Sequence, residues 1–251
     1  MAAAGDAHWW YAATRALLSE AVMPLVGPSS CAILSLDAAG GSGGTGSWLG
    51  EFGTVVVADL DEPSVANAAA SHPRCRPVVA DLTRLPHPAD RFDVTLCVTA
   101  LCHELVADPP AAVRELARVT RPGGHVVLME PGVRRLRRGH DAVTHTVRRF
   151  SRRDLGRLVE GAGLELVRST GAYTFLVPAA AALAAIEHGR SASDTGRNEG
   201  GLGGLLPVLA RAERAVLRRT SLPFGLSVIA IGRKTGSARV ACGATLVSRA
   251  G

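Results

Sequence analysis

The chain contains the run Leu34-Ser35-Leu36-Asp37-Ala38-Ala39-Gly40-Gly41-Ser42-Gly43-Gly44-Thr45-Gly46, in which an apolar segment ends at an acid and then breaks into glycines. Glycine has no Cβ, so its backbone can adopt positive φ and come close to a ligand. A loop of this kind between a strand and a helix directs backbone N–H groups toward a nucleotide-like molecule. Gly41, Gly43 and Gly46 also satisfy the GxGxxG pattern of dinucleotide binders, so the run alone leaves the ligand open.

Apolar segments that alternate with helical ones follow this run. Apolar and β-branched residues predict strands over 31–36, 54–58, 76–80, 92–98 and 124–129. A helix is expected over 110–120, where apolar residues line one face and Pro122-Gly123-Gly124 ends the pattern. Strands that alternate with helices indicate βαβ units, and hence a parallel sheet buried on both faces.

The two flanks of this alternating region have a different pattern. A helix is expected over 8–26. Beyond a basic segment at 133–150, Ser151 is placed to cap a helix over 151–162, with Asp154 at the third helical position. The remaining segments predict strands over 164–169 and 226–231, helices over 173–188 and 205–219, and a mobile loop over 189–204.

These segments predict one α/β domain over residues 1–235. Its N-terminal helix, about 8–26, is expected to act as a lid, and insertions at about 133–150 and 173–222 are expected to face the substrate. Residues 236–251 form a tail with no strong structural signal, for which disorder is left open.

The composition is that of a folded protein with a sizeable core. Of the 251 residues, 47% are hydrophobic, which excludes a disordered composition. No apolar stretch reaches the roughly 18 residues of a membrane span, and no signal peptide is visible, so a cytoplasmic protein is expected. The five cysteines are scattered without a CxxC pair, which favours reduced thiols and predicts no metal site.

The chain has a formal net charge of +6, and nearly all of its positive charge is arginine. Arginine clusters occur at 134–138 and 148–153. They lack the interleaved aromatic residues of a nucleic-acid surface. They therefore favour a solvated face, or a rim for an anionic substrate, over a nucleic-acid partner.

Three acids come directly after apolar strands: Asp37, Asp59 and Asp81. The carboxyl ends of parallel strands line the ligand crevice of an open sheet. A carboxylate there accepts hydrogen bonds from hydroxyl or amine groups. Each acid alone could be an ordinary turn residue, but three of them in register with a glycine loop indicate a nucleoside-like ligand.

The chain resembles the class I S-adenosylmethionine-dependent methyltransferases, in particular a bacterial small-molecule type. The resemblance rests on the order and spacing of several motifs over roughly residues 8 to 234. They are Leu36-Asp37-Ala38-Ala39-Gly40-Gly41-Ser42-Gly43, Val57-Ala58-Asp59-Leu60, Ala80-Asp81-Leu82, Phe92-Asp93-Val94 and Arg121-Pro122-Gly123-Gly124. It implies a Rossmann-like methyltransferase fold, with a mostly parallel seven-stranded sheet, helices on both faces and an antiparallel last strand inserted beside its neighbour.

The resemblance also implies roles for individual residues. S-adenosyl-L-methionine is the implied cofactor: Asp37 and the loop from Gly41 to Gly43 would approach its methionine part, Asp59 its ribose, and Asp81 with Leu82 its adenine. Ala39 and Leu60 are further expected cofactor-binding residues. Thr99, at the start of the segment that ends at His103, would border the sulfonium. The substrate side would include Trp9, Trp10, Tyr11 and Arg149.

One position departs from the family pattern. Ala39 stands where the motif has its first glycine. An alanine methyl group crowds the loop there, and alanine fits the slot without strain only if its φ stays negative.

Methyl transfer to a hydroxyl or amine group benefits from a base whose pKa is near neutral. The candidate bases are His103, beyond the fourth strand, and His140 and His145, with Asp141 as an orienting partner. The alternative for each histidine is a loop residue that contacts backbone or substrate without accepting a proton.

Two further functions remain open at this point. Ala39 and the lack of a clear base allow a methyltransferase-fold protein that no longer methylates, for example a cyclase or a binding partner in a biosynthetic pathway. The GxGxxG match allows an NAD-dependent oxidoreductase, although Asp37 before the glycines favours the methyltransferase. The expected acceptor is a small specialised metabolite; its identity, and whether the protein forms a homodimer, are left open.

Overall fold

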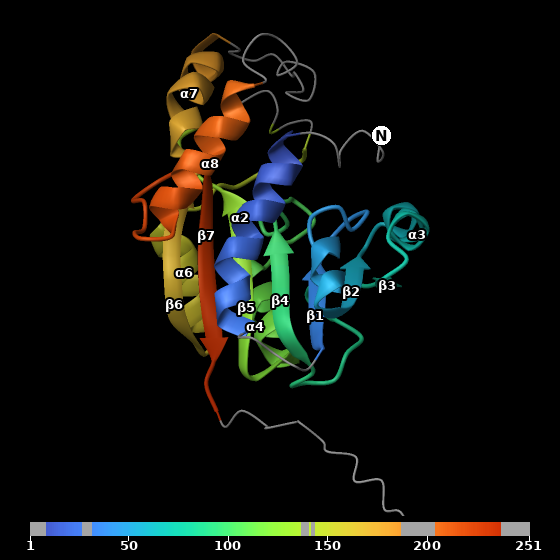
Figure 1. Cartoon of the computed structure of the whole chain (residues 1–251). Helices are drawn as coiled ribbons and strands as arrows, with labels where there is room; N and C mark the ends of the chain where they lie inside the picture. Colours follow the sequence, from blue (N-terminus) through green and yellow to red (C-terminus); the bar gives the residue numbers. More distant parts are fainter. Residues whose placement is uncertain (1–8, 27–31, 137–140, 142–143, 187–203, 237–251) are drawn as a thin grey trace, which may run out of the picture.

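The computed structural model describes residues 9–26, 32–136, 141, 144–186 and 204–236. Within these ranges the chain forms one seven-stranded sheet with the order β3-β2-β1-β4-β5-β7-β6 (Figure 1). The strands are β1 (Ile33–Ala38), β2 (Gly53–Asp59), β3 (Cys75–Val79), β4 (Phe92–Val98), β5 (Thr120–Pro131), β6 (Leu164–Ala172) and β7 (Ser227–Lys234).

The first five strands run parallel, and β7 lies antiparallel between β5 and β6. This confirms the predicted fold class, including the inserted antiparallel last strand. The strand order reverses beside β1, so the loops after β1 and β4 leave the sheet at a switch point where α/β proteins bind ligands.

Helices cover both faces of the sheet. One face packs against α2 (Trp9–Val26), α3 (Glu62–Ser71) and α8 (Leu205–Leu217), and the other against α4 (Pro109–Val119) and α6 (Arg152–Gly161). In Figure 1, α2 lies in front of the sheet, with α4 and α6 behind it. Helix α7 (Val177–Ile186) and part of α8 rise beyond the edge at which the parallel strands end.

The helix starts follow from local chemistry. Before α4, the Asp108 side chain accepts a hydrogen bond from the Ala111 N–H at 2.9 Å. Before α6, Ser151 and Asp154 form a reciprocal capping box, which confirms the predicted cap. The described part of the chain also contains two short 3-10 helices, η1 (Ser47–Glu51), after the glycine loop, and η2 (Thr174–Leu176), after β6.

The connections differ from the sequence prediction at two places. Strand β5 begins at Thr120 rather than 124, because Thr120 already pairs with Phe92 before a register shift, with Gly123 at φ 78°. Between β3 and β4, residues 80–91 carry turns, bends and one isolated bridge but no helix. The predicted loop at 189–204 and tail at 236–251 lie almost wholly outside the described residues.

Within the described ranges, no helix is long and apolar enough to span a membrane. Cys75, Cys97 and Cys102 are buried free thiols, as predicted, whereas Cys31 and Cys242 lie outside the described residues.

Candidate functional site

The glycine loop turns sharply away from the end of β1. Ala39, Gly41 and Gly43 all have positive φ, at 57°, 55° and 83°. The loop is closed by backbone hydrogen bonds, including Gly40 N–H to the Ala58 carbonyl at 3.1 Å. Ala39 therefore does not keep the negative φ that alanine needs to fit without strain; it adopts the left-handed conformation that the family's glycine would accept freely.

Asp37 lies beneath this loop and is 1% exposed. Its carboxyl group fills the space beside two glycines: a Cβ built on Gly40 or Gly46 would lie 2.6 Å or 2.4 Å from its nearest atom. Burial raises the pKa of Asp37 to about 7; the Gly46 N–H opposes this, and the charge of Asp59 adds to it. Its Oδ2 atom has no hydrogen-bond partner among the described residues. A cationic ligand group near the loop would favour the charged form of this carboxylate.

Asp59 and Asp81 lie at the ends of the neighbouring strands β2 and β3. The Asp59 carboxylate accepts the Gly41 N–H at 2.7 Å and the Asp61 N–H at 2.9 Å, so it links the glycine loop to β2. Asp81 accepts both the N–H and the hydroxyl of Thr83 at 2.7 Å, and these bonds lower its pKa. The structure thus brings the three predicted acids to one edge of three adjacent strands.

The two leucines beside these acids differ in exposure. Leu60 is 56% exposed, whereas Leu82 is buried in the core cluster that includes Leu36 and Phe92. Leu60 therefore presents its side chain to solvent at the crevice edge, and Leu82 anchors the segment after Asp81 to the core.

The loop after β4, residues 99–106, begins with a strained residue. Thr99 has φ 52°, although β-branched residues rarely adopt this conformation, and its N–H bonds the Met129 carbonyl at 2.7 Å. Unfavourable backbone conformations of this kind cluster at functional sites. His103 lies in the same loop, and burial followed by the charge of His145 lowers its pKa. Asp59 opposes this shift, so His103 lies within electrostatic reach of the crevice acids.

Glu130, which the sequence prediction missed, holds this loop from below. It is fully buried at the end of β5. Its Oε1 accepts the N–H groups of Ala100 at 3.1 Å and Leu101 at 2.9 Å, and its Oε2 accepts that of Cys102 at 3.1 Å. Burial raises the pKa of Glu130 to about 7, against the effect of these three donors. The sequence signal was available, because Glu130 follows an apolar strand as the three aspartates do.

Arg148 belongs to the arginine cluster for which a solvated face or a substrate rim was predicted, but its part-buried side chain instead binds the carbonyl side of the same loop. Its Nη1 donates to the carbonyls of Leu101 at 2.9 Å, His103 at 3.2 Å and Val106 at 2.6 Å. The loop that carries His103 is therefore held through its N–H groups by Glu130 and through its carbonyls by Arg148. We refer to this pair as the loop clamp.

The remaining predicted polar residues lie beside the clamp. His145 Nδ1 is 2.8 Å from Glu104 Oε1, and both side chains are exposed. Arg149 forms a two-point ion pair with Asp141 at 2.5 Å and 3.2 Å and also donates to the Gly132 carbonyl. The Arg149 side chain is only 9% exposed, and its hydrogen bonds tie Asp141 to the Gly132 carbonyl. His140 lies outside the described residues.

The predicted aromatic lid is tied to two parts of the site. Trp10 packs on Tyr173 with ring centroids 4.4 Å apart and meets Trp9 edge-on at 5.7 Å, while Tyr11 is 37% exposed. Farther along α2, the Arg15 side chain donates to the Gly44 carbonyl of the glycine loop at 3.0 Å. Helix α2 therefore connects the glycine loop to the insertion after β6.

The turn at Tyr173 is itself held by a buried interaction. Tyr173 has φ 57°, and its hydroxyl lies 3.0 Å from Thr14 Oγ1 on α2. The Glu213 carboxylate of α8 accepts the N–H groups of Tyr173 and Thr174. These bonds join α2, α8 and the 173 turn into one support next to the crevice.

The donors and acceptors at this edge fit S-adenosylmethionine. Asp59 offers acceptors for a ribose diol, and Asp81 for an adenine amine. Asp37 offers a buried carboxylate with an unpaired oxygen beneath the loop, which suits a cationic amino acid moiety. A Cβ built on Gly41 meets no atom of the described residues within 4 Å, so nothing in that part of the chain blocks its outer side.

Comparison with known proteins finds similar sequences among methyltransferases. Residues 36–128 match the model of a family described as a methyltransferase domain. A demethylmenaquinone methyltransferase from Mycobacterium marinum is 39% identical over 129 residues, which cover 50% of this chain and 49% of that protein. The chain thus spans about half the length of the curated relatives it matches.

Solved structures share the fold over most of the chain. A putative sarcosine dimethylglycine methyltransferase from Galdieria sulphuraria aligns with a TM-score of 0.58 and 16% identity, over 88% of this chain and 85% of that one. The [4+2]-cyclase SpnF aligns with a TM-score of 0.56 and 20% identity, over 87% of this chain and 82% of that one.

Proposed function

We propose that this chain transfers a methyl group from S-adenosylmethionine to an oxygen, nitrogen or carbon atom of a small molecule, and the match of residues 36–128 to a methyltransferase domain supports this proposal. The observation that carries the proposal is the set of carboxylates at the ends of three adjacent strands, Asp37, Asp59 and Asp81, beneath and beside the glycine loop. A small-molecule acceptor is supported by the curated relatives, which are named demethylmenaquinone methyltransferases.

When bound, S-adenosylmethionine supplies an electrophilic methyl group on a sulfonium. The residues of this chain bind and orient the reactants, which is the main contribution a protein makes to such a displacement. Asp59 would accept hydrogen bonds from the ribose hydroxyls, and Asp81 would accept one from the adenine amine. The Asp37 carboxylate would balance the positive charge of the cofactor from beneath the loop. Thr99 would border the sulfonium at the start of the clamped loop.

His103 is the proposed base for a hydroxyl or amine acceptor. Its lowered pKa keeps the imidazole neutral near pH 7, which is the form that accepts a proton. The clamp of Glu130 and Arg148 fixes the backbone on both sides of His103. His145 is the second candidate base, with Glu104 as the group that orients its ring.

The proposed substrate side consists of the N-terminal helix and the insertions at 133–150 and 173–222. Trp10 and Tyr173 join the first and the last of these segments. Arg15, on the same helix as Trp10, donates a hydrogen bond to the Gly44 carbonyl and so connects these aromatic residues to the glycine loop.

A second candidate is an enzyme of this fold that no longer transfers methyl groups. The observation in its favour is Ala39, whose methyl group stands in the positive-φ slot of the first motif glycine. Such an enzyme would bind the cofactor without converting it.

Isothermal titration calorimetry with S-adenosylmethionine and with S-adenosylhomocysteine tests the cofactor assignment. Saturable one-site binding of both, weakened in Asp59→Asn and unchanged in Asp61→Asn, is the expected result; no binding of either compound would refute it. Release of S-adenosylhomocysteine in the presence of an acceptor then separates methyl transfer from the second candidate, for which binding occurs without release. His103→Gln and His145→Gln, compared over a pH series of kcat, identify which histidine carries the proton.

A further inference from the structure

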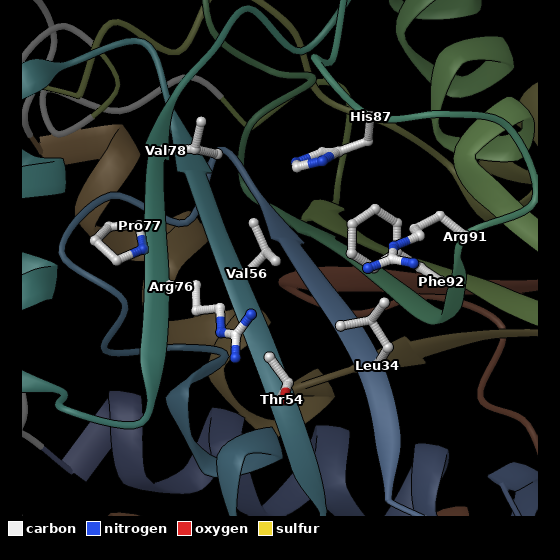
Figure 2. A pocket seen from close by; sticks show the side chains of 9 residues that line it. All are labelled: Leu34, Thr54, Val56, Arg76, Pro77, Val78, His87, Arg91 and Phe92. Atoms are coloured by element: carbon white, nitrogen blue, oxygen red, sulfur yellow. The ribbon is translucent and has the colours of Figure 1, made fainter.

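A cavity of about 250 Å³ lies on the sheet face that carries α4 and α6, away from the crevice acids (Figure 2). Its floor is formed by Leu34, Val56 and Val78, one residue from each of β1, β2 and β3. The cavity exists because α4 and α6 pack chiefly on β5, β6 and β7, while the 80–91 connection above β1–β3 contains no helix.

The cavity is separate from the proposed cofactor edge. Each floor residue precedes a crevice acid by three positions: Leu34 precedes Asp37, Val56 precedes Asp59 and Val78 precedes Asp81. A strand rises about 3.3 Å per residue, so the floor lies about 10 Å before the acids along the same strands. A ligand here would lie on the same strands as the cofactor without sharing its contacts.

Two arginines reach toward the cavity from opposite sides, Arg76 from β3 and Arg91 from the end of the 80–91 connection (Figure 2). Neither side chain makes a hydrogen bond or ion pair with another residue in the described part of the chain. The acids that flank Arg91 in sequence are already neutralised: Asp90 by Lys234 at 2.7 Å, and Asp93 by Arg121 at 2.6 Å. The cavity rim therefore carries two positive charges that are not compensated by these acids.

His87 lies over the floor and supplies a third polar group. Its ring meets Phe92 edge-on with centroids 5.1 Å apart, and its carbonyl accepts a hydrogen bond from Arg118 at 2.8 Å. Its Nε2 atom is buried without a hydrogen-bond partner among the described residues. Burial, followed by the charges of Arg91 and Arg118, lowers the pKa of His87. The ring is thus neutral at pH 7, in a positive field, with one nitrogen in need of a partner.

We propose that this cavity binds a small organic acid, with one ring over the apolar floor and a carboxylate held between Arg76 and Arg91. Guanidinium groups match carboxylates in charge and in geometry. Drug-sized ligands occupy clefts of about 300–1,000 Å³, so the smaller volume here suits a one-ring molecule. The orphaned His87 nitrogen is placed to bind a polar substituent on that ring.

The test is an NMR titration of the full chain with ¹³C-labelled histidine rings, using benzoate as the probe. Benzyl alcohol, which has the ring without the charge, and acetate, which has the charge without the ring, are the comparison probes. The expected result is a saturable shift of the His87 signal with benzoate, tighter than with either comparison probe. The pKa of His87 should rise in the complex, because the carboxylate offsets the charge of Arg91.

Variants assign the binding to the cavity. Arg76→Gln and Arg91→Gln should each weaken benzoate binding about two- to fivefold, the usual range for a partly exposed ion pair. Arg153→Gln, an exposed arginine of α6 outside the cavity, is the matched control and should leave it unchanged. Thermal unfolding midpoints equal to that of the parent chain show that the variants remain folded.

Three outcomes would overturn the proposal: equal affinity for benzoate and benzyl alcohol, undiminished binding in both arginine variants, or a His87 signal that does not move. The titration needs no S-adenosylmethionine. Its failure is therefore independent of any failure of the proposed methyl transfer.

Discussion

Replacing Ala39 by glycine should stabilise the protein, against the usual effect of placing glycine in a loop. Ala39 has φ 57°, and the left-handed conformation costs an L-residue about 1–2 kcal/mol. Glycine removes this cost but adds about 0.5–1 kcal/mol of conformational entropy in the unfolded chain. The free energy of unfolding should therefore rise by about 0.5–1 kcal/mol, which corresponds to about 1–4 °C in the unfolding midpoint for a chain of this size.

The same substitution one residue earlier is the matched control. Ala38 is the last residue of β1, is 0% exposed and packs in the core beside Leu36. Ala38→Gly removes a buried methyl group and loosens a strand, so it should lower the free energy of unfolding by about 1–2 kcal/mol. The two variants, which share their chemistry, are thus expected to shift stability in opposite directions.

Urea unfolding followed by circular dichroism measures both variants, and calorimetry with S-adenosylmethionine supplies the second readout. The Ala39→Gly chain should bind the cofactor at least as tightly as the parent, since the loop no longer carries a methyl group in the glycine slot. A lower free energy of unfolding in Ala39→Gly would refute the reasoning, because it would mean that Ala39 bears no backbone strain.

Three more predictions concern the site. Glu130→Gln should reduce the pH dependence of the free energy of unfolding. The pKa of Glu130 is about 7 in the native state against an ordinary 4.5, so between these values the native state keeps a proton that the unfolded chain releases. The parent protein therefore loses stability as the pH rises from 4.5 to 7, by up to about 1.4 kcal/mol per pH unit for this group. Urea unfolding at pH 5 and pH 7 measures how the free energy of unfolding changes with pH. If this change is the same in the variant and the parent, Glu130 is not its source. The part of the change that comes from Asp37 should remain in the variant. Arg148→Met removes the charged donor to three carbonyls, at a cost of about 2–3 kcal/mol, and should speed amide hydrogen exchange at 101–106, whereas Arg153→Met should not. Asp59→Asn should weaken S-adenosylmethionine binding roughly tenfold, because an amide group replaces one carboxylate oxygen. An unchanged affinity in calorimetry would show that Asp59 does not bind the ribose.

The parallel part of the sheet was predictable from sequence because β1, β2, β4 and β5 contain apolar runs, and because acids stand at the ends of β1, β2 and β3. Helix α6 was predictable for a different reason: Ser151 and Asp154 form a cap within four residues, so the signal is entirely local. Strand β5 shows the limit of this approach. Its first pairing, Thr120 with Phe92, depends on a strand far away in sequence, and the Pro122-Gly123-Gly124 turn signal hides it.

The crevice acids were predictable as a group, whereas the loop clamp was not. Glu130 acts on N–H groups about 30 residues earlier, and Arg148 acts on carbonyls more than 40 residues earlier. Such bonds exist only after β4 and β5 pair and the 144–149 segment returns to the sheet. The strained φ angles of Thr99 and Tyr173 were equally hidden, since neither residue type favours that conformation and only tertiary contacts impose it.

The clamp has a consequence for changing what the protein accepts. Glu130 and Arg148 hold the 99–106 loop chiefly through its backbone atoms, and Glu130 also bonds the Cys102 thiol, so the path of the loop does not depend on its exposed side chains. Leu105, which is 75% exposed and has no role in the proposed chemistry, can therefore be exchanged without altering that path, whereas Glu104 is kept because it contacts His145. A library confined to Leu105 would explore acceptor selectivity on a fixed scaffold, separating the evolution of new chemistry from the maintenance of the fold.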